Sequence, residues 1–410
     1  MNDQRHLDVI CFGGEDWWYK NRGHIDMQLM RRFARMGTTL YVNSIVMQKP
    51  TLKKNTAGGK SFTHKLIRKM KSILRGLQES GVGFWVYSPL SLPVHHVAWA
   101  RPLNEMILRR QIRRIGRKLR MDRPLIWIAC PAACDTALKI RESYLVYQRT
   151  DRLEEYPNVD SNIIKTYDRK LKTSADLTVF VNKTLYDQEA SQCQKAIYLD
   201  HGVDFDFFVN AERDSSVPEE MAEIPKPIVG FFGAIDDHTM DVPFVEKVVD
   251  LLPETSFVFV GDASSDVTGL QSHKNVWLLG RKNYEQIAHY GKCFDVAMMP
   301  WRQNDWIEGC NPIKLKEYLA LGKPTVSTPF PELDKYLDVV YQAKTPEAFA
   351  EAIQRGLAED NEERVAARRK KIQKATWDSK AALVLERLFE SGEPGETMIP
   401  NPADRTVGCR

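Results

Sequence analysis

The chain has 410 residues, 43% of them hydrophobic and 27% charged, which is typical of a globular protein of two or three domains. Its longest run free of both charge and strong polarity, residues 124–133, has about ten residues, whereas a membrane-spanning helix needs about 20, so we expect no transmembrane helix. The first residues lack the basic-then-apolar order of a secretory signal and the seven cysteines are scattered, so we expect a cytoplasmic setting.

The charge of the chain is unevenly distributed. The formal net charge is only +4, but residues 51–125 contain 17 Lys or Arg and only three acidic residues. Such a concentration of positive charge indicates an anionic partner for this segment.

Two amphipathic helices are predicted inside the basic segment. Residues 65–77, KLIRKMKSILRGL, place apolar side chains at helical spacing among Lys and Arg, and residues 103–119 repeat the pattern. Either helix alone could pack on a sheet and turn a charged face to solvent. Two of them in one domain favour an anionic membrane surface or a lipid phosphate. Nucleic acid is not favoured, because no nucleic-acid-binding motif accompanies the charge.

Short β-branched and aromatic runs alternate with helix-length segments along the whole chain. This alternation predicts parallel sheets that are covered by helices on both faces. The runs predicted as strands are 8–14, 39–45, 83–89, 124–130, 144–150, 177–182 and 196–201, followed by 227–235, 256–262, 276–280, 295–300, 324–328 and 339–343.

The strands fall into two groups, which predict two α/β domains that face each other across a cleft. We expect a first domain over 1–210, an acidic and proline-containing linker over 211–226, and a second domain over 227–376. A helix over 377–390 could cross back to the first domain. Residues 391–410 are rich in proline and glycine and are expected to form a loose tail.

Residues 311–328, NPIKLKEYLALGKPTVST, carry the most informative motif. Asn311 is a good N-cap and Pro312 suits the first helical position, so we expect a helix to Leu321 that Gly322 closes. Lys314 then lies in the first turn, where a cation opposes the helix dipole. This placement is reasonable if an anion, such as a nucleotide diphosphate, binds at the helix N-terminus.

Glu317 lies one turn after Lys314 on the same helix face. A carboxylate there could accept hydrogen bonds from the diol of a ribose. The alternative is an exposed Lys-Glu pair on the helix surface, and spacing alone leaves this alternative open.

The motif resembles the nucleotide-binding signature of group 1 glycosyltransferases with the GT-B fold, Asn-Pro-x-Lys-x-x-Glu-Tyr followed by Gly-Lys-Pro. The resemblance extends to RGHIDMQLMRRFARMGTTLYVNS, LVYQRTDRLEEYP, YLDHGVDFDFF, VGFFGAIDDHTMD, MMPWRQND and TWDSKAALVLERLFE. It implies an α/β fold of two Rossmann-like domains whose parallel sheets face a central cleft. The donor-binding residues that it implies are Gly14, Gly233, Arg302, Asn311, Pro312, Ile313, Lys314 and Glu317.

The chain departs from the family pattern at one catalytic position. Retaining members often carry a second glutamate upstream of the equivalent of Glu317, but Gly309 stands there and Glu308 is displaced by one residue. Either a bulge returns Glu308 to the site, or the enzyme inverts the anomeric centre with a general base from the first domain. Asp151, at the carboxyl end of a predicted strand, is the candidate base, and capping of the next helix is its alternative role.

Four first-domain residues are further candidates. Gly13 and Gly14 end the first strand, where a Gly-Gly turn lets the backbone approach an acceptor or a phosphate. The resemblance places Arg22 near the acceptor and His24 in the catalytic centre, although both could be surface residues. The string FGGEDWW lacks the GxGxxG pattern, so no nicotinamide cofactor is expected.

In the second domain, Gly233 and Arg302 follow strands and could contact the diphosphate. Asp204 and Asp206 form a DxD motif, but they more readily cap a short helix than bind a metal. We therefore expect no metal site and no cofactor, and a UDP-sugar is the favoured co-substrate.

The function that the sequence favours is transfer of a sugar from a nucleotide diphosphate sugar to a lipid-linked saccharide, at the inner face of the cell membrane, in surface polysaccharide synthesis. A nucleotide-sugar 2-epimerase of the same fold is one alternative. A non-catalytic binder of anionic polymers or membranes is another, but it leaves Lys314 and Glu317 without a role.

Overall fold

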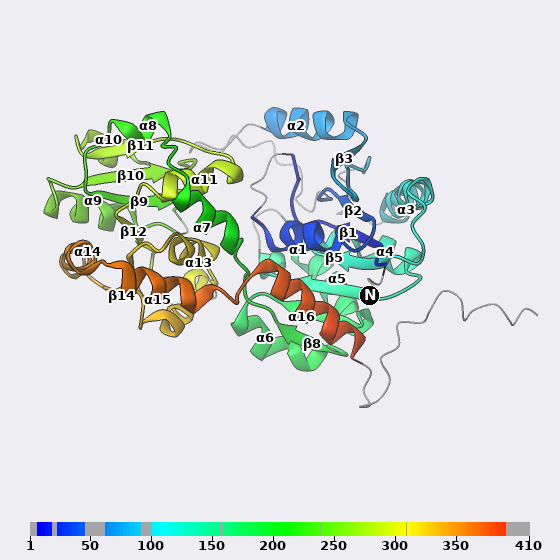
Figure 1. Cartoon of the computed structure of the whole chain (residues 1–410). Helices are drawn as coiled ribbons and strands as arrows, with labels where there is room; N and C mark the ends of the chain where they lie inside the picture. The colour runs from blue at the N-terminus through cyan, green and yellow to red at the C-terminus, as the bar shows by residue number, and fades with distance from the viewer. Residues whose placement is uncertain are drawn as a thin grey trace, which may run out of the picture.

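The structure is a computed structural model that describes residues 6–18, 23–45, 62–91, 100–155, 159–237, 239–308 and 310–390. Its elements form two α/β units, each built on one sheet (Figure 1). The first unit lies on the right of Figure 1, in blue and cyan, and the second lies on the left, in yellow-green to orange. The α/β class with two Rossmann-like sheets is therefore confirmed.

The first sheet has eight strands in the order β3-β4-β2-β1-β5-β6-β7-β8. Its strands are β1 Val9–Phe12, β2 Thr39–Val42, β3 Leu77–Gly81, β4 Phe84–Tyr87, β5 Leu125–Ile128, β6 Leu145–Arg149, β7 Leu177–Phe180 and β8 Ala196–Tyr198. All neighbours pair in parallel except β3 and β4, which form an antiparallel hairpin. The sequence does not predict β3, because its residues, LQESG, lack the apolar character of a buried strand.

Helices cover both faces of this sheet. They are α1 Ile25–Phe33, α2 Phe62–Leu74, α3 Arg101–Lys118, α4 Cys134–Ile140, α5 Ser161–Ser174 and α6 Lys183–Glu189, with short 3-10 turns at Pro131–Ala133, Leu153–Glu155 and Ala190–Gln192. The two predicted basic helices are present as α2 and α3, each with bounds shifted by a few residues. Alternate residues of β1 enter different core clusters, so both faces of the sheet are buried.

The second sheet has six parallel strands in the order β11-β10-β9-β12-β13-β14. Its strands are β9 Ile228–Phe232, β10 Ser256–Val260, β11 Val276–Leu278, β12 Val296–Met299, β13 Thr325–Ser327 and β14 Tyr341–Gln342. The helices of this unit are α7 Phe205–Arg213, α8 Glu219–Ala222, α9 Val242–Leu251, α10 Thr268–Ser272, α11 Tyr284–Gly291, α12 Asp305–Glu308, α13 Ile313–Leu321, α14 Pro346–Glu359 and α15 Glu362–Ile372, with a 3-10 turn at Pro331–Tyr336.

The segment 211–226, expected as a linker, packs on the second unit. Ala211, Met221 and Ile224 are buried in the same core cluster as strands β9 and β12. The apolar side chains between its acidic residues explain this packing. The chain instead passes from the first unit to the second within residues 199–204, between β8 and α7.

A second connection runs in the opposite direction. After α15 the chain returns to the first unit, where α16, Trp377–Phe389, packs against α1 and joins the core cluster beneath β1 and β7. In Figure 1, α16 is the red helix that lies along the lower face of the first unit. Among the described helices, none combines the length and apolar character needed to cross a membrane.

Candidate active site

Charged residues of both units surround the loop before α13. Burial raises the pKa of Cys310 to about 12, and the charges of Asp151, Lys314 and Asp236 also act on this thiol. Asp151 follows β6 of the first sheet, whereas Asp236 and Lys314 belong to the second unit. Charges that follow strands of both sheets therefore act on the loop before α13, and ligands of such sheets bind at the carboxyl ends of their strands.

Helix α13 begins one residue later than predicted. Pro312 is the N-cap, in extended conformation, and the helix runs from Ile313 to Leu321. Asn311 does not cap it, because its side-chain amide donates instead to the hydroxyl of Tyr198 at 2.9 Å. Gly322 closes the helix in the left-handed conformation, as predicted.

Lys314 lies over the end of β9. A Cβ atom at Gly233 would approach Cε of Lys314 to 2.3 Å, and Gly233 has a φ of 138°, so both space and backbone require glycine there. The ammonium nitrogen lies 4.7 Å from the ring centroid of Phe231 and 5.8 Å from that of Trp301. It makes no hydrogen bond or ion pair with any residue that the structure describes. Burial lowers the pKa of Lys314, and the charges of Asp236 and Glu317 oppose this shift.

Glu317 lies one helical turn further into the site. The residue is 5% exposed, and its carboxyl forms no hydrogen bond within the described part of the chain. Burial raises its pKa to about 8, which Lys314 opposes and Asp204 reinforces. The alternative of an exposed Lys314-Glu317 ion pair is therefore wrong: the carboxyl is buried, and no ion pair joins the two side chains.

Arg302 follows β12 and is half-buried. Its Nε donates to the carbonyl oxygen of Met240 at 3.2 Å, and it forms no ion pair among the described residues. The free edge of its guanidinium remains available to an anion.

Asp151 belongs to a turn that a buried arginine holds. Nη1 of Arg149 donates to the carbonyl oxygen of Asp151 at 2.9 Å, and the amide of Leu153 donates to the same oxygen at 2.9 Å. Helix α5 is capped by Asp160, so Asp151 does not cap that helix, and the helix that directly follows Asp151 is the 3-10 turn Leu153–Glu155.

The Arg149 side chain is 1% exposed and lies among several carboxylates. It pairs with Glu154, Asp168 and Glu189, and Lys172 pairs with the last two. Such a buried network fixes the backbone at the end of β6 and thereby the place of Asp151.

The remaining first-unit candidates have structural explanations or lie at the surface. A Cβ at Gly13 would lie 2.1 Å from the Tyr41 ring, and the amide of Gly14 already donates to Asp26 at 2.9 Å. His24 is exposed, and its charge contributes to lowering the pKa of His201.

Two candidates receive no support from contacts. Glu308 is exposed at the end of α12, and its neighbour Gly309 lies outside the described residues. Arg22 also lies outside the described residues. Within the described chain, no group of three or more His, Cys, Asp or Glu side chains could hold a metal ion.

The sequence does not identify the residues that act through tertiary contacts. Asp26 accepts from both Gly14 and the Tyr41 hydroxyl, and Asp236 lies near Lys314. Lys316 is part of the quoted motif, but its spacing from Lys314 places it on another side of α13. No local pattern distinguishes these residues from surface charges.

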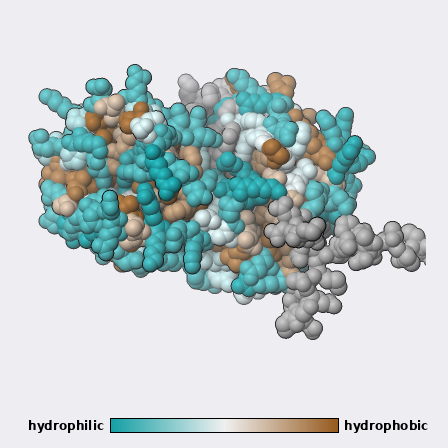
Figure 2. All heavy atoms as spheres, in the orientation of Figure 1, coloured by the Kyte–Doolittle hydropathy of each residue, from teal (hydrophilic) through white to brown (hydrophobic). Residues whose placement is uncertain are grey.

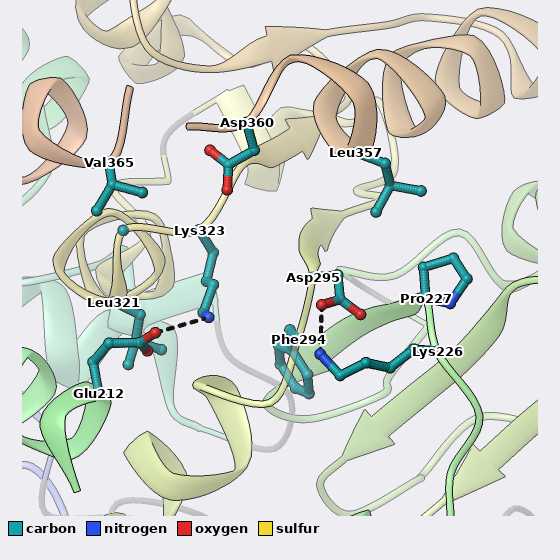
Figure 3. Close-up of a pocket in the computed structure, with 11 residues that line it drawn as sticks. Glu212, Lys226, Pro227, Phe294, Asp295, Leu321, Lys323, Leu357, Asp360 and Val365 are labelled. Carbon is teal, nitrogen blue, oxygen red and sulfur yellow. Dashed lines mark hydrogen bonds and ion pairs between the residues drawn. The ribbon is translucent and has the colours of Figure 1, made fainter. Parts of the chain in front are cut away.

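A hollow of about 530 Å³ lies at the opposite end of α13 (Figure 3). Its lysines are paired: Lys226 with Asp295 at 2.7 Å and Lys323 with Glu212 at 3.4 Å. Figure 3 shows both pairs as dashed lines. This hollow therefore lacks the unpaired cation that distinguishes the N-terminus of α13.

The family model for group 1 glycosyl transferases matches residues 226–359. Residues 226–359 are thus a group 1 glycosyltransferase domain. The chain is also 24% identical over 225 residues to the putative teichuronic acid biosynthesis glycosyltransferase TuaH of Bacillus subtilis, a match that spans 50% of this chain and about half, 56%, of that protein.

Solved structures share the fold over nearly the whole chain. Sucrose-phosphate synthase of Thermosynechococcus elongatus has a TM-score of 0.63 at 14% identity and covers 93% of this chain and 98% of its own. A glycosyltransferase of Rickettsia africae has a TM-score of 0.63 at 13% identity, with coverages of 94% and 98%. HepE of Anabaena in complex with UDP and glucose has a TM-score of 0.60 at 11% identity, with coverages of 94% and 100%. The fold is therefore GT-B, as expected.

Proposed function

We propose that the chain transfers a sugar from a UDP-sugar to a saccharide acceptor in the cleft between its two units. The observation that carries this proposal is the unpaired Lys314 ammonium, which lies over Gly233 at the N-terminus of α13. A helix N-terminus with a buried, unpaired cation is suited to a diphosphate.

The donor is proposed to bind along the second unit. The diphosphate contacts Lys314, Arg302 and the first amides of α13, and the ribose diol donates to Glu317. As the bond between the sugar and the diphosphate breaks, negative charge develops on the leaving oxygen. Lys314 and the helix dipole stabilise that charge, so the proposed reaction requires no metal ion.

In the proposed inverting reaction, Asp151 is the base. Its carboxylate takes the proton of the acceptor hydroxyl, the hydroxyl oxygen bonds to the anomeric carbon, and UDP leaves with the bonding electron pair. The support for this role is that the charges of Asp151 and Lys314 both act on the Cys310 thiol. Retention of configuration would instead require another group, and Glu308 is the residue to test.

The acceptor is proposed to be a lipid-linked saccharide of a surface polysaccharide. The relative TuaH is described as a teichuronic acid biosynthesis glycosyltransferase, which supports an acceptor of this class. A lipid-linked acceptor requires the enzyme to work at a membrane surface, and the basic segment supplies a surface for that purpose.

Helix α2 carries the features of a membrane-docking surface. Ile67, Met70 and Leu74 are 54%, 48% and 80% exposed and share one face of the helix. Val82 and Leu90, also in the basic segment, are 96% and 53% exposed. In Figure 2, brown atoms interrupt the hydrophilic surface at the right-hand end of α2. Apolar side chains among cations favour an anionic bilayer, and we propose docking at the inner face of the cell membrane.

One predicted cation of α2 points inward. Nζ of Lys69 donates to the carbonyl oxygen of Ser44 at 2.7 Å, and burial lowers its pKa. Lys71 is exposed, and the guanidinium of Arg75 lies 4.8 Å from the Trp18 ring. The proposed docking surface therefore uses Lys71 and Arg75 and excludes Lys69.

A thermal-shift screen against UDP, GDP, dTDP and CMP and their sugars tests the donor site. UDP should raise the melting temperature, because a ligand at 100 times its Kd stabilises the fold by about 2.7 kcal/mol. Lys314→Ala should lose this shift. A wild-type protein that responds to none of the nucleotides would contradict the proposal. If the protein converts a UDP-sugar to its epimer without an acceptor, its function is epimerisation and not sugar transfer.

A further inference from the structure

The two chain segments that join the units lie side by side. Val203 pairs with Thr376 in a parallel bridge, and the amide of Val203 donates to the carbonyl oxygen of Ala375 at 2.8 Å. Gly202 packs closely here, since a Cβ atom on it would lie 2.7 Å from the Trp377 ring. Any rotation of one unit against the other has to occur around this pair of segments.

A cluster of three charges lies beside this hinge. The carboxylate of Asp200, in the first connecting segment, accepts from Nζ of Lys316 at 2.5 Å and also from Nζ of Lys380. Lys316 belongs to α13 and Lys380 to α16, so one carboxylate joins a helix of the second unit to the helix that packs on the first. Lys316 also donates to the carbonyl oxygen of His201.

The cluster depends on Asp200 for its charge balance. Lys316 is 1% exposed, so without Asp200 its ammonium would face Lys380 without an ion-pair partner among the described residues. Burial opposes ionisation of Asp200, but its two lysines lower its pKa to about 2. Burial and Lys316 lower the pKa of His201 to about 3, so this histidine adds no positive charge at neutral pH.

Helix α13 presents different sides to the proposed donor site and to the hinge. Lys314 and Glu317 are the donor residues proposed above, whereas Lys316 points to the hinge. A second contact holds the start of the helix: Asn311 donates to the hydroxyl of Tyr198, which donates to Glu332 at 3.1 Å. The orientation of the donor helix relative to the first unit is thus set at Asp200 and Tyr198.

We propose that Asp200 is a positioning residue: by joining Lys316 and Lys380, it holds the donor helix in register with the first unit, so that a bound donor meets Asp151 across the cleft. This inference rests on the proposed function, but the cluster itself contacts no donor group. Its loss should change the arrangement of the two units and the turnover, and leave nucleotide affinity unchanged.

The test compares Asp200→Asn with Asp176→Asn. Both aspartates have side chains that are 27% exposed, and Asp176 pairs with Arg141 away from the hinge. We expect Asp200→Asn to enlarge the radius of gyration in small-angle scattering and to slow UDP release from the donor sugar by tenfold or more, since misplacement of about 1 Å can cost about 100-fold. Its Kd for UDP should stay within about twofold of the wild-type value, which calorimetry measures. Asp176→Asn should behave as wild type in all three measurements.

A double variant separates positioning from stability. Lys316→Met removes the buried cation that Asp200→Asn leaves unpaired, so the melting temperature of the double variant should return towards the wild-type value. If turnover and radius of gyration also return, the cluster is only structural and the inference is overturned. Unchanged scattering and turnover in Asp200→Asn would overturn it as well. A wild-type protein that binds no UDP would contradict the proposed function, while scattering of the unliganded variants still decides the role of Asp200.

Discussion

Glu317 holds its carboxyl where ionisation is unfavourable. Its pKa is raised from 4.5 to about 8, chiefly by burial. At pH values between these two pKa values, the Glu317 carboxyl keeps its proton in the folded protein but has lost it in the unfolded chain. The free energy of unfolding therefore falls as the pH rises through this window, and this loss is complete above the folded pKa.

Glu317→Gln should remove this dependence. We expect the variant to gain stability relative to wild type between about pH 5 and pH 8, by up to about 1.4 kcal/mol per pH unit. Chemical denaturation at several pH values measures the difference. Glu386→Gln, at an exposed position of α16, is the control and should show no trend. A stability difference that stays constant with pH would contradict the assigned ionisation.

Lys314 and Glu317 should also contribute separately to donor binding. Lys314→Ala removes the cation of the diphosphate, and Glu317→Ala removes the acceptor for the ribose. Each loss should cost about 1.5 to 3 kcal/mol, or one to two decades in the Kd for UDP measured by calorimetry. Lys371→Ala, whose ammonium pairs with Asp338 on the second unit, should bind UDP normally. Unchanged affinity in both site variants, with the fold intact, would exclude this donor site.

At the scale of elements, local signals predict local structure. Gly322 ends α13 in the left-handed conformation, as the sequence indicates, because glycine lacks a Cβ atom and adopts this conformation without tertiary contacts. The start of α13 differs, because Asn311 has a better partner in Tyr198, which is remote in the sequence. The polar strand β3 and the packed segment 211–226 differ from the sequence prediction for the same reason, because both are held by contacts with other elements of the fold.

Helix α2 can be tested as an element by itself. Replacing Ile67, Met70 and Leu74 by Ser should weaken binding to vesicles that contain anionic lipid, because exposed apolar area drives insertion. Flotation of the protein with vesicles measures this binding. Leu251 and Leu337, 46% and 47% exposed on the second unit, provide a matched Ser control that should stay bound.

Charge and insertion make separate contributions to docking. Lys71→Gln with Arg75→Gln should lower vesicle binding at low salt and reduce its dependence on salt, because screening shortens to about 3 Å at 1 M. Nucleotide binding should not change in either variant. If both the apolar variant and the charge variant bind anionic vesicles as strongly as the wild-type protein, α2 is not part of the docking surface.

At the scale of the whole molecule, the proposed site combines donor residues of the second unit with Asp151 of the first. The sequence identifies Lys314 and Glu317 because both lie in one helical motif. It cannot show how close Asp151 lies to them, since more than 150 residues separate the two segments and tertiary contacts between the units set their distance. The sequence does not identify the contact between Asp200 and Lys316 either, because each residue by itself resembles an ordinary surface charge.

Asp151→Asn tests whether the first unit supplies the general base of the reaction. Asn keeps the shape of the side chain but cannot accept the proton of the acceptor hydroxyl. Transfer should therefore slow by about 100-fold or more, while the Kd for UDP stays nearly constant, because the donor residues lie on the other unit. Asp160→Asn, at the cap of α5, keeps a capping side chain and should transfer at the normal rate. Analysis of the product anomer by NMR completes the test: retained configuration, or near-normal turnover of Asp151→Asn, would mean that Asp151 positions the acceptor and that Glu308 becomes the residue to examine.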